Sequence, residues 1–212
     1  DVAARTRVLA VDTARGFVVV DNPAGLLSVP PRGNPRRANL QRWLARTLGQ
    51  PVHTVHRLDM ATSGVCVYAL APETQAWLGD AFQRRRVVKE YVAEVHVDHH
   101  SSPRLVRGGS GVVMAPLARH PESRLRHRID SLAGRHAVTA YHVLDRNGNR
   151  ALVRFSPVTG KSHQLRVHSA SAWPAGLGAP IAGDPLYPDP CVHRYPYILA
   201  AMDAHALPST KS

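Results

Sequence analysis

The chain contains five short runs rich in valine and other β-branched or aromatic residues: 17–20, 64–70, 87–97, 138–144 and 151–155. Such side chains favour extended backbone, so each run predicts a strand. In residues 87–97, Tyr91 and every second residue to Val97 are apolar. Because side chains alternate along a strand, we expect these residues on one face, directed at a core.

Two amphipathic segments are expected to form helices. Asn39 is a favourable N-cap and Gly49 a favourable stop for the first, whose apolar positions include Leu40 and Leu44. The second is expected over residues 73–86. Residues 98–131 are rich in Arg, His, Gly and Pro, and we interpret them mainly as a connection. The connection that contains Asn147-Gly148 is expected to exceed two residues. Mixed strands and helices predict an α+β protein.

The formal net charge of +12 indicates a polyanionic partner. Each phosphate that the protein neutralises releases condensed counterions, so a basic protein gains affinity for nucleic acid. Arginine carries most of the excess, and its guanidinium both forks onto phosphate and stacks on bases. A membrane surface is the alternative partner, but no apolar stretch of about 18 residues predicts a spanning helix. We therefore expect RNA or another polyanion, and no membrane association.

Nothing in the sequence predicts a metal, a cofactor or an oxidising compartment. Cys66 and Cys191 form no CxxC pair, and the thirteen histidines include no HExxH pattern. Walker and GxGxxG patterns are absent. Residues 1–10 lack the basic head and apolar run of a signal peptide. We expect a cytoplasmic protein that holds neither metal nor cofactor.

The densest polar cluster spans residues 55–64, immediately before an expected strand. Loops at strand ends often carry function. The cluster combines an acid, a guanidinium, an imidazole and two hydroxyls, which together could hold a reactive carboxylate. An ordinary hydrogen-bonded turn would use the same residues, and the residues alone leave both interpretations open.

His56-Arg57-Leu58-Asp59, followed by Thr62-Ser63-Gly64, resembles the signature of the RluA-type RNA pseudouridine synthases. Four further segments resemble motifs of that family in the same order: 22–30, 89–93, 160–168 and 183–187. Order and approximate spacing agree from residue 17 to residue 187. Met60-Ala61 extends the match towards the bacterial RluA branch, which acts on ribosomal and transfer RNA.

The resemblance implies the pseudouridine synthase fold, which is α+β. This fold has a mixed, largely antiparallel sheet in two lobes, flanking helices and a central catalytic cleft. Residues 1–212 would form a single catalytic domain, without a separate S4 domain. The reaction needs no cofactor or metal, the partner is ribosomal or transfer RNA, and we expect a monomer.

The resemblance also assigns catalytic roles. Asp59 would be the essential carboxylate, and Arg166 would pair with it and keep it ionised. Tyr91 would stack on the target uracil and accept a proton from C5. The residues by themselves also allow noncatalytic roles. Arg166 could form a surface ion pair or contact a phosphate, and Tyr91 could be a core residue.

A second set of residues is expected to bind the substrate: Arg57, Leu165, His56, Thr62 and His163. A uridine stacked in RNA cannot present its ribose to a carboxylate, so it must be flipped out. Arg57 is the candidate to enter the vacated space, and Leu165 would pack against the base. The two histidines would brace the active-site loops. Six arginines are candidates for backbone contacts: Arg32, Arg36, Arg37, Arg84, Arg85 and Arg86.

Two other functions remain possible on the same residues. The first is a noncatalytic RNA-binding or RNA-chaperone protein that retains the fold. The second is a hydrolase that uses Asp59 with another carboxylate, which such enzymes place across the scissile bond. Glu90 and Asp184 are the acids to test for that role. Isomerised uridine, unchanged bound RNA, or released fragments would separate the three.

Overall fold

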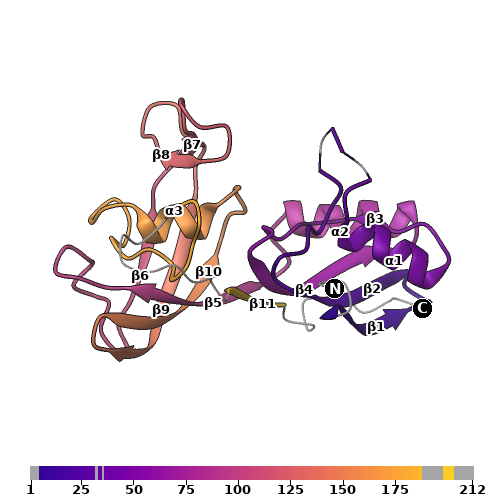
Figure 1. Ribbon diagram of the computed structural model, residues 1–212, viewed down its shortest axis with the longest axis horizontal. Coiled ribbons are helices and arrows are strands. Elements are labelled where there is room, and N and C mark those ends of the chain that lie inside the picture. The colour runs from indigo at the N-terminus through magenta and orange to yellow at the C-terminus, as the bar shows by residue number, and fades with distance from the viewer. Residues whose placement is uncertain (1–4, 32, 35, 188–197, 203–212) are drawn as a thin grey trace. The chain divides into compact units, whose positions relative to one another are not determined.

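A computed structural model describes residues 5–31, 33–34, 36–187 and 198–202 (Figure 1). Arg32 and Cys191 therefore lie outside the described residues. The chain divides into two compact units. Unit 1 comprises the described residues up to Val88 together with 199–202, and unit 2 runs from Lys89 to Ile198.

Unit 1 contains antiparallel strands and two helices. Its antiparallel strands are β1 (Arg7–Asp12), β2 (Phe17–Asn22), β3 (His53–Thr54) and β4 (Thr62–Ala69), and its helices are α1 (Leu40–Leu48) and α2 (Pro72–Gln83). Residues 199–202 of β11 (Ile198–Met202) also belong to this unit. Strand β2 lies between β1 and β4, with Phe17 opposite Ala69 and Asn22 opposite Gly64. A buried cluster that includes Phe17 and Leu78 packs α2 against this sheet.

The helix signals in the sequence are confirmed for α1. The Asn39 side chain accepts a hydrogen bond from the Arg42 N–H at 2.9 Å, and Gly49 ends the helix with φ of 66°. The second predicted helix is correct in place but too long, because α2 ends at Gln83. Arg85 adopts φ of 57°, a left-handed conformation that cannot continue a right-handed helix.

Unit 2 contains four antiparallel neighbouring strands of a sheet, in the order β5 (Lys89–His96), β10 (Arg150–Pro157), β9 (Val138–Asn147), β6 (Ser110–Met114). Helix α3 (Gln164–Ala170) follows β10. Ala93, Val95 and Val97 are buried in one core cluster, and Tyr91 packs against it. The predicted face of this strand is therefore confirmed.

The interpretation of residues 98–131 as mainly connection is wrong where it leaves out three short strands. These residues contain β6 and a separate two-stranded sheet formed by β7 (Leu117–Arg119) and β8 (His127–Ile129). These strands are short, and only Val113 of β6 is buried, so the alternation of apolar residues is weak. The expected long turn after β9 is also wrong. Only Gly148 and Asn149 separate β9 from β10, and Gly148 has the positive φ of 55° that a tight hairpin needs.

The described residues show the α+β arrangement that the sequence predicts. Among them, no helix has the length and hydropathy needed to cross a bilayer. No group of three or more His, Cys, Asp or Glu side chains in this part of the chain is placed to hold a metal ion.

Candidate active site

The backbone around Asp59 is anchored on both sides. The hydroxyl of Ser28 donates to the Leu58 carbonyl at 3.1 Å and accepts from the Leu58 N–H at 3.1 Å. The Gly25 N–H donates to the Met60 carbonyl at 2.7 Å. Residues 22–30 and 56–64, two of the segments recognised in the sequence, therefore pack together in unit 1. They fix the residues before and after a half-buried Asp59.

His56 attaches the same loop to its neighbours. Its Nε2 accepts a hydrogen bond from the Val67 N–H at 3.0 Å, so the proton of this neutral ring is on Nδ1. The ring also stacks on Phe82 of α2, with centroids 4.7 Å apart. Thr62 is buried where β4 begins, and its N–H closes the turn by donating to the Asp59 carbonyl at 2.8 Å. Arg57 is exposed beside this turn.

Replacing Ser28 with alanine is expected to destabilise unit 1 and to weaken catalysis. Ser28 is 2% exposed, so its loss leaves the buried N–H and carbonyl of Leu58 without their partner. An unsatisfied buried polar group costs about 1–3 kcal/mol. Urea unfolding measures that loss, and turnover at saturating RNA should fall with it. The same substitution at the exposed Ser131 should change neither, and equal effects at both serines would contradict this account of the loop.

Helix α3 begins at a strained residue in unit 2. His163 precedes the helix with φ of 55°, a left-handed conformation that is uncommon outside glycine. Its Nδ1 lies 3.0 Å from the Tyr187 hydroxyl. The next residue, Gln164, is buried and donates to the Val138 carbonyl and to the Thr139 hydroxyl, both at 2.9 Å. These contacts fix the start of α3, and Leu165 then packs against the same core cluster as Tyr91.

Arg166 forms a buried, bidentate ion pair with Asp184. Its Nε and Nη2 donate to the two carboxylate oxygens at 2.6 and 2.7 Å, and the two residues are 6% and 2% exposed. Burial alone would raise the pKa of Asp184. The hydrogen bonds and charge of Arg166, with the N–H groups of Leu186 and Tyr187, outweigh burial and hold that pKa below its ordinary value. The Arg166 guanidinium also lies 5.1 Å from the centre of the Tyr187 ring.

The role of Asp184 was missed by the sequence reasoning, which gave Asp59 as the partner of Arg166. The available signal was the motif at residues 183–187, but a motif does not show which side chain meets which. Asp59 and Arg166 belong to different units, so their pairing remains a prediction. The two oxygens of Asp184 already accept from Arg166, Leu186 and Tyr187. This carboxylate is thus poorly suited to be the second acid of a hydrolase.

His168 of α3 completes a hydrogen-bonded chain beneath the helix. The Thr139 hydroxyl accepts from Gln164 and lies 2.9 Å from Nδ1 of His168, while Nε2 lies 2.9 Å from the Ala115 carbonyl. A carbonyl only accepts, so Nε2 carries the proton and Nδ1 accepts from Thr139. Burial lowers the pKa of this ring, and its hydrogen bond to Ala115 opposes that only partly.

The lowered pKa of His168 predicts a loss of stability in acid. The fold favours the neutral ring, so its contribution is complete above the ordinary pKa of 6.5. This contribution to the free energy of unfolding is lost as the pH falls from 6.5 towards the pKa of His168 in the folded protein. The loss is at most about 1.4 kcal/mol per pH unit. The difference in unfolding free energy between wild type and His168→Gln should shrink as the pH falls from 7 to 5. A constant difference would contradict the assignment of a neutral ring.

Each predicted site residue has a defined place within its own unit. Unit 1 holds Asp59, Arg57, His56 and Thr62, and unit 2 holds Tyr91, Leu165, Arg166 and His163. Their catalytic and binding roles remain predictions.

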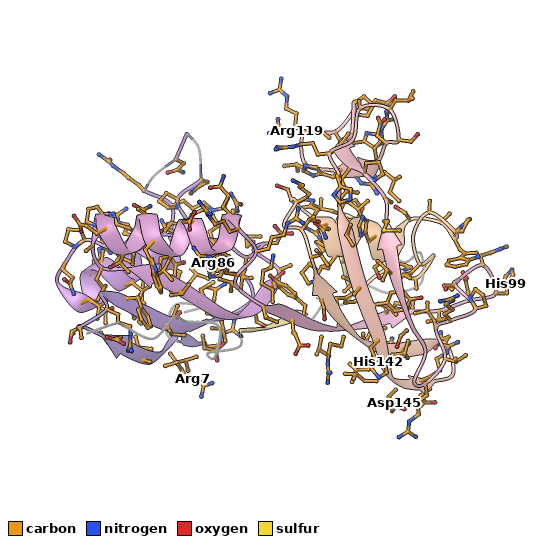
Figure 2. The ribbon with its side chains drawn as sticks, turned by 180° about the vertical axis from the view of Figure 1, so that it is seen from behind. Arg7, Arg86, His99, Arg119, His142 and Asp145 are labelled. Atoms are coloured by element: carbon orange, nitrogen blue, oxygen red, sulfur yellow. The ribbon has the colours of Figure 1, made fainter. Side chains whose placement is uncertain are left out.

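The arginines predicted to contact RNA differ from one another in environment. Arg84 and Arg86 both pair with Asp80, at the end of α2. Figure 2 shows Arg86 from this group. Arg85 stands between them and is exposed.

Known proteins resemble the chain over most of its length. Residues 16–171 match the family model described as RNA pseudouridylate synthase. The dual-specificity RNA pseudouridine synthases RluA of Salmonella typhi and Escherichia coli are each 39% identical over 175 residues, covering 82% of this chain and 74% of theirs.

Two human structures share the fold. Human RNA pseudouridylate synthase domain containing 4 is 31% identical, with a TM-score of 0.65 over 86% of this chain and 69% of that one. Domain containing 1 has a TM-score of 0.72 at 23% identity, over 93% of this chain and 77% of that one. The family match extends from β2 in unit 1 to the end of α3 in unit 2. The chain therefore belongs to the RNA pseudouridylate synthase family.

Proposed function

We propose that this protein isomerises uridine to pseudouridine in RNA. The bond from C1′ of the ribose to N1 of uracil breaks, the base turns, and a bond from C1′ to C5 forms. The proton on C5 is lost and N1 gains one, so the reaction involves neither redox change nor net hydrolysis. The observation that carries the proposal is the family match over residues 16–171, which includes the anchored loop around Asp59.

Asp59 would supply the reactive carboxylate. It could attack the ribose or the base, or remove a proton from the sugar. Each route needs an ionised carboxylate held still against the substrate, because positioning contributes much of the rate in such steps. The hydrogen bonds from Ser28 to Leu58 and from Gly25 to Met60 support this role, since they fix the backbone on both sides of Asp59.

Arg166 and Tyr91 would act on the same uridine as Asp59. A guanidinium has five N–H donors, so the pair with Asp184 is compatible with contact to a second carboxylate. Arg166 would keep Asp59 ionised by its charge. Tyr91 would stack on the uracil and take the proton from C5, and Leu165 would exclude water from the base. Arg57 would occupy the space left by the flipped nucleotide.

The substrates are expected to be ribosomal RNA, transfer RNA or both. The net charge of +12 suits a polyanionic substrate, and the similar bacterial enzymes are named as dual-specificity RNA pseudouridine synthases. We also propose that the protein acts in the cytoplasm, as a monomer and without a cofactor.

Nucleoside analysis would test the substrate class. Unmodified transcripts of transfer RNA and of ribosomal RNA would be incubated separately with the protein. Each RNA would then be digested to nucleosides, and the nucleosides would be separated by chromatography. Pseudouridine elutes apart from uridine at the same mass. Pseudouridine from either transcript supports the proposal, and its distribution assigns the substrate. Bound RNA that contains only uridine after long incubation would contradict it.

A further inference from the structure

The hairpin of unit 2 that contains β7 and β8 is strongly basic. Residues 117–129 include four arginines and a single acid, Glu122. The arginines are Arg119, Arg124, Arg126 and Arg128, and all four are exposed. Figure 1 shows this hairpin projecting from the rest of unit 2, where it forms a sheet separate from β5, β10, β9 and β6. We call residues 117–129 the basic arm.

Two arginines of the basic arm are available to a ligand. Arg128 pairs with Asp130 at 2.8 Å, and the Arg126 guanidinium lies 5.5 Å from the centre of the Tyr187 ring. Arg119 and Arg124 form no ion pair with any residue in the described part of the chain. An exposed guanidinium without a carboxylate partner can fork onto a phosphate without first losing an internal contact.

The base of the basic arm is fixed to α3. Leu117 at one end of the arm packs in a buried cluster with Val167 of α3 and with Tyr187, and Ile129 at the other end packs against that cluster. The Asp130 N–H donates to the Pro116 carbonyl at 2.9 Å, which closes the base. The arm therefore projects from a base that is packed against α3.

Tyr187 connects the basic arm to Arg166. Its hydroxyl accepts from the His127 N–H of β8 at 2.6 Å and lies 3.0 Å from Nδ1 of His163, the residue before α3. The Tyr187 ring lies 5.1 Å from the Arg166 guanidinium. One side chain, 8% exposed, therefore contacts β8, the residue before α3 and the arginine proposed for catalysis.

We propose that the basic arm docks the substrate RNA through phosphate contacts of Arg119 and Arg124, and that Tyr187 transmits this docking to Arg166. The proposal rests on the proposed function, because it takes RNA as the substrate and Arg166 as part of the catalytic site. Arg119 and Arg124 then contribute affinity, while Tyr187 is a positioning residue that contributes turnover.

Salt-dependent binding tests the docking role. The probe is a tritium-labelled transfer RNA transcript, with a ribosomal RNA transcript in parallel, bound to wild type and to Arg119→Gln/Arg124→Gln. Each lost phosphate contact removes about 0.7–0.9 from the slope of log affinity against log salt. The double variant should therefore lose about 1.5 from the slope and bind roughly tenfold more weakly near 150 mM salt.

A charge-matched control separates the arm from the net charge. Arg104→Gln/Arg107→Gln removes two exposed arginines from the loop before β6, where Arg107 lies 3.9 Å from Asp145. Figure 2 shows Asp145 and Arg119 at opposite ends of unit 2. This control should change affinity less than threefold. An equal loss in both double variants, or no loss in the arm variant, would overturn the docking role.

Tyr187→Phe tests the transmission. The variant keeps the ring next to Arg166 but removes the hydroxyl that holds His127 and His163, so kcat should fall about tenfold with little change in KM. In wild type the arm substitutions should raise KM and also lower kcat. In the Tyr187→Phe background they should raise KM alone. Additive effects on kcat would overturn the transmission.

The outcomes for the arm and for the proposed function are distinguishable. If wild type releases no tritium from C5-labelled RNA, the proposed function fails, and the salt slopes still decide whether the arm docks RNA. If wild type releases tritium while the arm variant keeps its affinity and its slope, the function stands and the docking role fails.

Discussion

Asp59→Asn is expected to lower turnover by roughly 10⁴-fold or more, because it removes the carboxylate on which every proposed route depends. The asparagine has nearly the same size and fits the same backbone. Hydrogen bonds of Leu58 and Met60 hold that backbone on both sides of Asp59. Release of tritium from C5 of uracil, followed in single-turnover reactions with excess enzyme, measures the loss.

Two controls accompany the Asp59 variant. Its affinity for the same RNA should stay within about threefold of wild type, because the proposed phosphate contacts are made by arginines. Its unfolding in urea should remain a single cooperative transition, which shows that the variant is folded. A variant that folds, binds RNA and still turns over within tenfold of wild type would remove Asp59 from the chemistry.

Asp184→Ala is expected to produce the largest loss of stability of any substitution considered. It removes the carboxylate that pairs with the buried Arg166 guanidinium at 2.6 Å. Breaking a buried ion pair by removing one partner costs about 3–5 kcal/mol, since the remaining charge stays desolvated. Urea unfolding at pH 7 measures the difference. A loss below about 1 kcal/mol would show that the pair contributes little to the folded state.

The double variant Arg166→Met/Asp184→Leu isolates the cause of that loss. Replacing both charges with apolar side chains of similar size removes the buried guanidinium together with its carboxylate, so this protein should be more stable than Asp184→Ala. It should also be inactive, because the guanidinium proposed for catalysis is gone. If the double variant is instead the less stable of the two, packing around Asp184 rather than the broken ion pair explains the destabilisation.

Much of the fold could be predicted because local signals and tertiary packing agree. Asn39 caps the start of α1 with a side-chain hydrogen bond, and Gly49 ends the helix in a left-handed conformation. Both effects are local and depend little on the rest of the protein. The alternation from Tyr91 to Val97 appears in the sequence because one face of β5 contacts the core. Secondary structure can be predicted from a sequence where local conformational preference and tertiary packing favour the same structure.

Other features depend on contacts that the sequence does not display. Strands β7 and β8 are three residues each, too short for a periodic pattern, and their base is buried against α3 and Tyr187. The pairing of Arg166 with Asp184 joins residues 18 positions apart through a loop. Resemblance to a family placed both residues in motifs, but only the folded backbone shows that their side chains meet.

The most direct test of the central claim follows tritium release by the wild-type protein. Transfer and ribosomal RNA transcripts labelled at C5 of uracil would be incubated with the protein, and released tritium would be compared with the integrity of the RNA. We predict tritium release that matches the pseudouridine formed, with full-length RNA. Tight binding without release from either RNA would contradict isomerisation and favour a noncatalytic RNA-binding protein, and released uracil or shortened RNA would indicate a hydrolase.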